Sequence, residues 1–165
     1  MARRVFHSFH YKRDSHRVSQ IRQMGAIEGQ QLLSSNAWEQ VKRGGDRAIK
    51  AWINEQMNGK SCAVVLIGSS TAGRRWVDYE IKKAWDDGRG LFGVYIHNLK
   101  NLAGKQSGKG SNPFATFTVG PNKTKLSTIV KAYDPPYSTS TNVYSHIKDN
   151  LGGWVEEAIR IRKNY

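Results

Sequence analysis

The stretch that decides the fold is "CAVVLIG" at residues 62–68, followed directly by "SSTAGRRWVDYEIKKAW" at residues 69–85. The first segment is continuously apolar and lacks the polar–apolar alternation of a half-exposed strand. Such a run predicts a strand that is buried on both faces, as in a parallel sheet covered by helices. The second segment has apolar residues at helical spacing, so we expect a helix over residues 75–85.

The flanking segments continue this alternation of helix and strand. "LFGVYIH" at residues 91–97 predicts the next buried strand, and "RRVFHSF" at residues 3–9 predicts the first strand of the chain. Amphipathic patterns predict helices over residues 46–59 and 14–24, the second with Asp14 as its N-cap. Strands that alternate with helices are typical of βαβ units, so we expect an α/β fold with a mostly parallel sheet.

The remaining segments have weaker patterns. Residues 25–38 are ambiguous and could contain a short strand, while residues 98–125 are rich in Gly, Lys, Asn and Ser and predict a long loop. We expect the last strand at residues 126–133 and a C-terminal helix over about residues 151–163. The length is ordinary for one domain and no internal repeat is present, so residues 1–165 are interpreted as a single domain.

The composition narrows the class of protein. The 165 residues carry a formal net charge of +13 and one cysteine, Cys62, which excludes an internal disulfide and predicts a cytoplasmic protein. We find no signal peptide, and the apolar runs are too short to cross a membrane. The charge favours an anionic partner. Because the basic residues are dispersed, a solvated surface, nucleic-acid attraction and steering of a phosphate-bearing ligand all stay open.

Motifs of metal and nucleotide chemistry are largely missing. The sequence has no GxxxxGK[ST], HExxH or GxSxG pattern, and none of its five histidines pairs with the cysteine at metal spacing. We therefore expect no metal and no cofactor. In open parallel sheets, ligands bind beyond the carboxyl ends of the strands. Here those ends fall at residues 8–11, 68–70 and 97–98, which bring aromatic rings to one edge with polar groups such as Ser69 and Asn98.

One carboxylate stands beside the apolar stripe of the helix over residues 75–85. Val77 and Ile81 define the inner stripe, and Glu80 lies on its flank, one turn after Trp76. Helical side chains lean towards the helix N-terminus, so this carboxylate leans towards the ligand edge of the sheet. A salt bridge to Arg75, Lys83 or a neighbouring loop is the ordinary interpretation, and a role in a ligand site is the alternative.

Four stretches of the chain carry a family resemblance. They are "RVFHSFHY" (residues 4–11), "VVLIGSSTAGRRWVDYEI" (residues 64–81), "VYIHNLK" (residues 94–100) and "GSNPF" (residues 110–114). They resemble the bacterial TIR-like (Toll/interleukin-1 receptor type) proteins of the Thoeris anti-phage defence system. The resemblance implies a flavodoxin-like α/β domain with helices on both faces of the sheet. It also implies an enzyme that cleaves NAD+, its substrate rather than a cofactor, and makes an ADP-ribose-derived messenger.

The resemblance assigns roles to individual residues. The family's catalytic glutamate falls in a W-x-x-x-E motif, which here runs from Trp76 to Glu80. Nicotinamide leaves NAD+ as a neutral base, so one carboxylate that stabilises the oxocarbenium-like ribose is sufficient chemistry. Arg74 or Arg75 could pair with the pyrophosphate, with plain surface charge as the alternative. The full set of expected substrate-binding residues is Phe6, Ser8, His10, Tyr11, Ser69, Arg74, Arg75, Trp76 and Asn98.

The resemblance also predicts partners. They are NAD+, a separate effector protein reached through a diffusible nucleotide signal, and a phage component as the trigger, with no membrane. Oligomerisation is left open, because the loop after the first helix lacks the Pro-Gly pair of animal TIR domains. Two other functions compete with this one: a non-catalytic TIR-like binding or assembly module, and a basic nucleic-acid-binding protein. Release of free nicotinamide from NAD+ would distinguish an enzyme from the non-catalytic module. The lack of a recognisable reading motif argues against the second.

Overall fold

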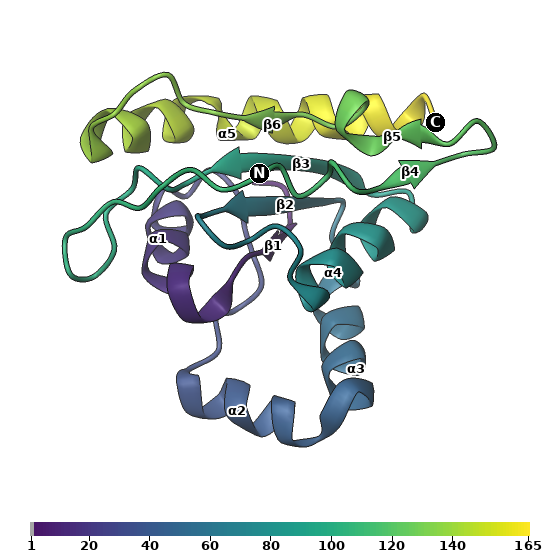
Figure 1. The fold of residues 1–165 in the computed structure, drawn as a ribbon, viewed down its shortest axis with the longest axis horizontal. Coiled ribbons are helices and arrows are strands. Elements are labelled where there is room, and N and C mark those ends of the chain that lie inside the picture. The colour runs from purple at the N-terminus through teal and green to yellow at the C-terminus, as the bar shows by residue number, and fades with distance from the viewer. Residues whose placement is uncertain (1) are drawn as a thin grey trace.

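The computed structural model describes residues 2–165 and contains a four-stranded parallel sheet in the order β1-β2-β3-β6 (Figure 1). Its strands are β1 (Val5–Ser8), β2 (Cys62–Ile67), β3 (Gly90–Tyr95) and β6 (Ala132–Tyr133). A small antiparallel hairpin lies apart from it, formed by β4 (Thr118–Val119) and β5 (Thr124–Lys125). The expected α/β architecture with a mostly parallel sheet is therefore confirmed.

Helices cover both faces of the sheet. The helices are α1 (Tyr11–Gln23), α2 (Ser35–Arg43), α3 (Gly45–Met57), α4 (Arg75–Asp86), α5 (Ser140–Lys163) and the short 3₁₀ helix η1 (Leu126–Thr128). Apolar residues of α1 and α5 form one core with the sheet, and those of α3 and α4 form a second core on the opposite face. Helix α2 lies away from the sheet and continues into α3 (Figure 1).

The two cores explain why β2 has no polar residue. Val64 and Leu66 face the core shared with α1 and α5, whereas Val65 and Ile67 face the core shared with α3 and α4. All six residues of β2 are buried, as are all six of β3. A central strand covered on both faces needs apolar side chains at every position, so the apolar run at residues 62–68 is what this sheet requires.

A second strand next to β1 is reduced to one bridge. Arg4 pairs with Glu28 in a parallel bridge, and beyond it the side chain of Gln30 takes over the pairing. The Gln30 amide oxygen accepts from the backbone N–H of His7 at 2.9 Å, and its amide nitrogen donates to the His7 carbonyl at 2.8 Å. The prediction of a short strand within residues 25–38 is therefore wrong, because only one residue of this segment pairs with the backbone of the sheet. Its place beside β1 gives the flavodoxin-like strand order with the second strand almost absent.

Helix α1 starts one turn earlier than the sequence pattern indicated. His10 is its N-cap, and the His10 side chain accepts from the backbone N–H of Arg13. Asp14 is therefore not a cap but an interior residue of the helix. It is buried and forms an ion pair with Arg17 at 2.9 Å. The Arg17 guanidinium also donates to the carbonyls of Leu99 and Lys105, so it holds the following loop against α1.

The C-terminal third departs most from expectation. Residues 126–133 contain η1 and only the two-residue strand β6, because Leu126 to Val130 turn back to bury apolar side chains against the core. Helix α5 begins at Ser140, eleven residues before the expected start, and packs across β3. Among residues 2–165, no helix is both long and apolar enough to cross a membrane.

Candidate active site

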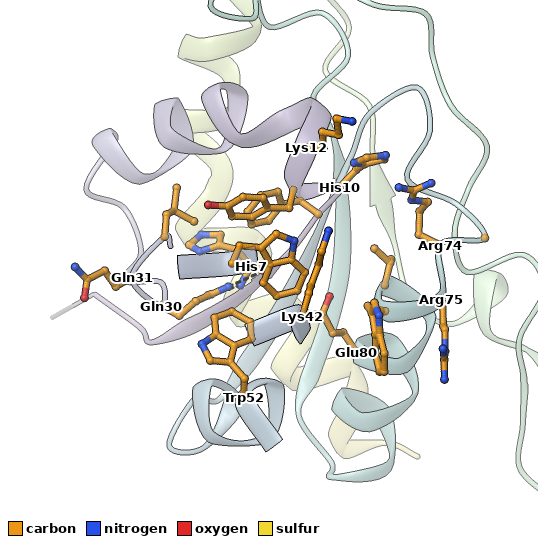
Figure 2. A pocket seen from close by; sticks show the side chains of 17 residues that line it. His7, His10, Lys12, Gln30, Gln31, Lys42, Trp52, Arg74, Arg75 and Glu80 are labelled. Carbon is orange, nitrogen blue, oxygen red and sulfur yellow. Dashed lines mark hydrogen bonds between the residues drawn. The ribbon is translucent and has the colours of Figure 1, made fainter. Parts of the chain in front are cut away.

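A cavity of about 500 Å³ lies beside the carboxyl end of β1, between the first turns of α1 and α4 and the inner sides of α2 and α3 (Figure 2). This volume is within the usual range for small-molecule sites. Its lining residues are His7, Phe9, His10, Tyr11, Lys12, Gln30, Gln31, Leu32, Trp38, Lys42, Trp52, Gly73, Arg74, Arg75, Trp76, Val77 and Glu80.

Glu80 is the buried carboxyl group of this cavity. Its residue is 8% exposed, and its Oε1 accepts a hydrogen bond from the Ser8 hydroxyl at 2.7 Å. Burial raises the pKa of Glu80 from 4.5 to about 8, and the Ser8 bond offsets only part of this shift. No cation pairs with Glu80 among the described residues, so the salt-bridge interpretation of this position is wrong. A buried carboxyl with a raised pKa in a cavity is typical of a catalytic site.

Aromatic rings form one wall of the cavity. Phe9, Tyr11, Trp38 and Trp52 follow each other with ring centroids 5.8, 5.5 and 5.8 Å apart. They come from the segment after β1, from α1, from α2 and from α3. Trp76 lies in the first turn of α4, one turn before Glu80, and also lines the cavity. Such rings can stack on a planar base and exclude water from the carboxyl group.

Positive charge gathers at the start of α4. Arg74 is the N-cap residue of this helix, and no side chain caps the helix end. The first N–H groups of a helix lack intrahelical partners and carry the positive end of the helix dipole, so they favour an anion. Arg75 is engaged elsewhere, since its guanidinium pairs with Asp46 and lies over the Trp76 ring at 4.7 Å. Burial and the neighbouring Arg74 lower the pKa of His10, which favours the neutral form of its ring.

Most of the residues expected from the sequence meet in this cavity. The lining includes His10, Tyr11, Arg74, Arg75, Trp76 and Glu80. Ser8 is not part of the lining, but its hydroxyl holds the carboxyl group of Glu80 in place. Their roles in binding or catalysis stay predictions.

Three expected residues lie elsewhere. Phe6 is fully buried. Its side chain lies on the face of the sheet that α3 and α4 cover, and it packs in the core there. Ser69 and Asn98 follow β2 and β3, whereas the cavity lies beside β1, so neither contributes to the lining. The Asn98 amide instead donates to the carbonyl of Tyr137 at 3.2 Å. We leave these three residues out of the site.

Several residues that line the cavity were not predicted from the sequence. His7, Gln30, Trp38 and Trp52 all line the cavity, yet they come from four separate segments. No pattern in the sequence links these four segments. Within residues 2–165, no group of three His, Cys, Asp or Glu residues is arranged to hold a metal ion.

The fold is α/β with a parallel sheet, and a buried carboxyl group in a Trp-x-x-x-Glu sequence lies beside an aromatic cavity at the strand ends. These features together define a TIR-like domain. The family model described as "Thoeris protein ThsB, TIR-like domain" matches residues 6–101. This match spans more than half of the chain, so the chain belongs to that family, and the resemblance noted from the sequence is confirmed.

A relative from Bacillus cereus (strain MSX-D12) carries the name "Putative cyclic ADP-D-ribose synthase ThsB1". It is 38% identical to this chain over an alignment of 123 residues, and the match covers 69% of this chain and 62% of the relative. The chain therefore spans less than two thirds of the length of the curated relative that it matches.

Proposed function

We propose that this protein cleaves NAD+ at the bond between nicotinamide and ribose and converts the remainder into a cyclic ADP-ribose signal. The observation that carries the proposal is the carboxyl group of Glu80, buried at the aromatic cavity and held by Ser8. Membership of the ThsB TIR-like family and the name of the Bacillus cereus relative support the same reaction class.

The chemistry requires little beyond a positioned carboxylate. The C1′–N bond breaks, its electron pair leaves with nicotinamide, and positive charge develops on the ribose. A carboxylate close to that carbon stabilises the charge most strongly where water is excluded. The buried position of Glu80 beside Trp76 provides such a place. Nicotinamide departs as a neutral molecule, so no general acid is needed.

The raised pKa of Glu80 fits a substrate that is itself a cation. In the free protein Glu80 is mostly protonated at pH 7, because its pKa is about 8. The pyridinium ring of NAD+ carries a positive charge, and a nearby positive charge lowers the pKa of a carboxyl group. Binding of NAD+ therefore favours release of the Glu80 proton. The carboxylate forms where the ribose cation will develop.

Other parts of the cavity suit the pyrophosphate and the bases of NAD+. The pyrophosphate fits the uncapped N-terminus of α4 beside Arg74, which supplies N–H groups and a positive charge. The bases can stack on the wall of Phe9, Tyr11, Trp38 and Trp52. Capture of the ribose cation by an atom of the same ADP-ribose gives a cyclic product. Capture by water would give linear ADP-ribose.

The signal would act through other proteins. A diffusible nucleotide is the simplest way for a TIR-like enzyme of this size to control a separate effector protein. We further propose that a phage component triggers the activity in the cell, where we place the protein in the cytoplasm. The family assignment to a Thoeris system supports both steps.

The test is incubation of the purified protein with NAD+ and measurement of free nicotinamide and the nucleotide product by mass spectrometry. We expect nicotinamide in equal amount to a product that lacks the added water of ADP-ribose. Glu80→Gln should give neither, whereas Glu55→Gln, a change at an exposed carboxylate of α3, should behave as the wild type. Equal turnover by folded Glu80→Gln would overturn the assignment.

A further inference from the structure

The imidazole of His7 is a buried polar group. The residue is 1% exposed, and neither ring nitrogen has a hydrogen-bond partner within residues 2–165. The backbone of His7 is by contrast fully paired, because the Gln30 amide bonds both its N–H and its carbonyl. Burial lowers the pKa of the ring to about 3, so His7 is neutral at physiological pH. A neutral imidazole offers one N–H donor and one acceptor.

The surroundings of this ring are adapted to it. A methyl group at Gly29 would lie 1.9 Å from Nδ1 and 2.0 Å from Cε1 of His7, so only glycine leaves room for the imidazole there. Buried polar atoms normally have a partner, because an unpaired one lowers stability. An apolar ring at position 7 would avoid this cost. The unpaired ring nitrogens of His7 therefore point to a partner supplied from the cavity that His7 lines.

The position of His7 identifies which part of a ligand it would meet. In Figure 2, His7 and Gln30 lie on one side of the cavity and Arg74 and Arg75 on the other, with Glu80 between them. The following step rests on the proposed function. If the pyrophosphate lies at Arg74 and the ribose at Glu80, the group bonded to the far side of that ribose extends towards His7. That group is the pyridine base.

We propose that His7 is a specificity-determining residue that hydrogen-bonds the carboxamide of the pyridine base. A primary carboxamide has one carbonyl acceptor and N–H donors, which complement the donor and acceptor of a neutral imidazole. The ring nitrogens are covered in the free protein, next to Gly29. Contact between the base and these nitrogens therefore requires residues 29–34, which form no helix or strand, to move aside when the base binds.

The direct test is nuclear magnetic resonance of the imidazole nitrogens in protein labelled with 15N-histidine. The His7 signals are assigned by their loss in His7→Phe, and nicotinamide is then titrated into the wild type. We expect the His7 nitrogen signals to move with nicotinamide and to move much less with unsubstituted pyridine. The signals of His16, an exposed residue of α1, should stay in place. His7 signals unchanged at saturating nicotinamide would overturn the proposal.

A matched pair of variants gives a second readout. His7→Phe should weaken nicotinamide binding about tenfold, the effect of one lost hydrogen bond, and His16→Phe should not. His7→Phe should also lower the preference for NAD+ over the dinucleotide without the carboxamide about tenfold, with little change in kcat. Equal affinity of wild type and folded His7→Phe for nicotinamide would contradict the assignment. A protein inactive on NAD+ whose His7 signals still respond to nicotinamide would refute the proposed reaction and support this subsite.

Discussion

Replacement of Glu80 by glutamine should change the pH dependence of stability, because burial in the folded protein disfavours the ionised form of this carboxyl group. The pKa of Glu80 is about 8 in the folded protein, against 4.5 for an unperturbed glutamate. Between these values the unfolded chain is ionised while the folded protein keeps the proton. The folded state therefore loses stability as pH rises from about 4.5 to about 8, and the loss is complete above that range.

The magnitude follows from the size of the shift. One pKa unit corresponds to about 1.4 kcal/mol, so the carboxyl should lower the free energy of unfolding by about 3 kcal/mol between pH 5 and pH 8. Glu80→Gln removes this titration but keeps an amide oxygen that can accept from Ser8. Any cost of burying the new amide is independent of pH and cancels when the two pH values are compared.

The assay is urea unfolding of wild type, Glu80→Gln and the exposed-site control Glu55→Gln at both pH values. The stability of Glu80→Gln relative to wild type should rise by about 3 kcal/mol from pH 5 to pH 8, and that of the control should hardly change. The same relative stability of Glu80→Gln at both pH values would refute the reasoning. It would mean that the carboxyl is hydrated or already ionised in the folded protein.

Other expected outcomes concern charge in and beside the cavity. Arg74→Gln should raise the KM for NAD+ about tenfold and Arg75→Gln much less, because Arg75 already pairs with Asp46; equal losses would contradict the placement of the pyrophosphate. The kcat/KM for NAD+ should rise from pH 6 to pH 8 as free Glu80 ionises, and a flat profile would argue against carboxylate catalysis. Arg17→Met should lower the free energy of unfolding by about 3 kcal/mol in thermal or urea melts, since it leaves a buried aspartate unpaired.

The centre of the fold could be predicted because its signals are local. An apolar run such as residues 62–68 has few alternatives to a strand that is covered on both faces. The spacing of Val77 and Ile81 indicates which side of helix α4 faces the core. Glu80 could be placed on the flank of that face for the same reason. Its unpaired, buried state could not be predicted, because this depends on how β1, and with it Ser8, is placed against α4.

The errors fall where tertiary packing overrides local preference. Helix α5 begins in a run of Ser and Thr and contains Gly152 and Gly153, all weak helix formers, yet its buried stripe continues through both halves. The absent second strand depends on a side-chain amide, Gln30, that replaces backbone pairing, which no periodicity reports. The aromatic wall depends on how α2 and α3 bring Trp38 and Trp52 to Tyr11 of α1, which is a consequence of the chain path rather than of a sequence pattern.

The central claim is that Glu80 enables this protein to cleave NAD+ and release a cyclic ADP-ribose signal. The most direct measurement is mass spectrometry of nucleotides from phage-infected cells that express either the wild type or Glu80→Gln at equal folded levels. The account predicts that NAD+ falls and a cyclic ADP-ribose accumulates only with the wild type. The same product at the same level with Glu80→Gln, or unchanged NAD+ and no new nucleotide in either culture, would contradict it.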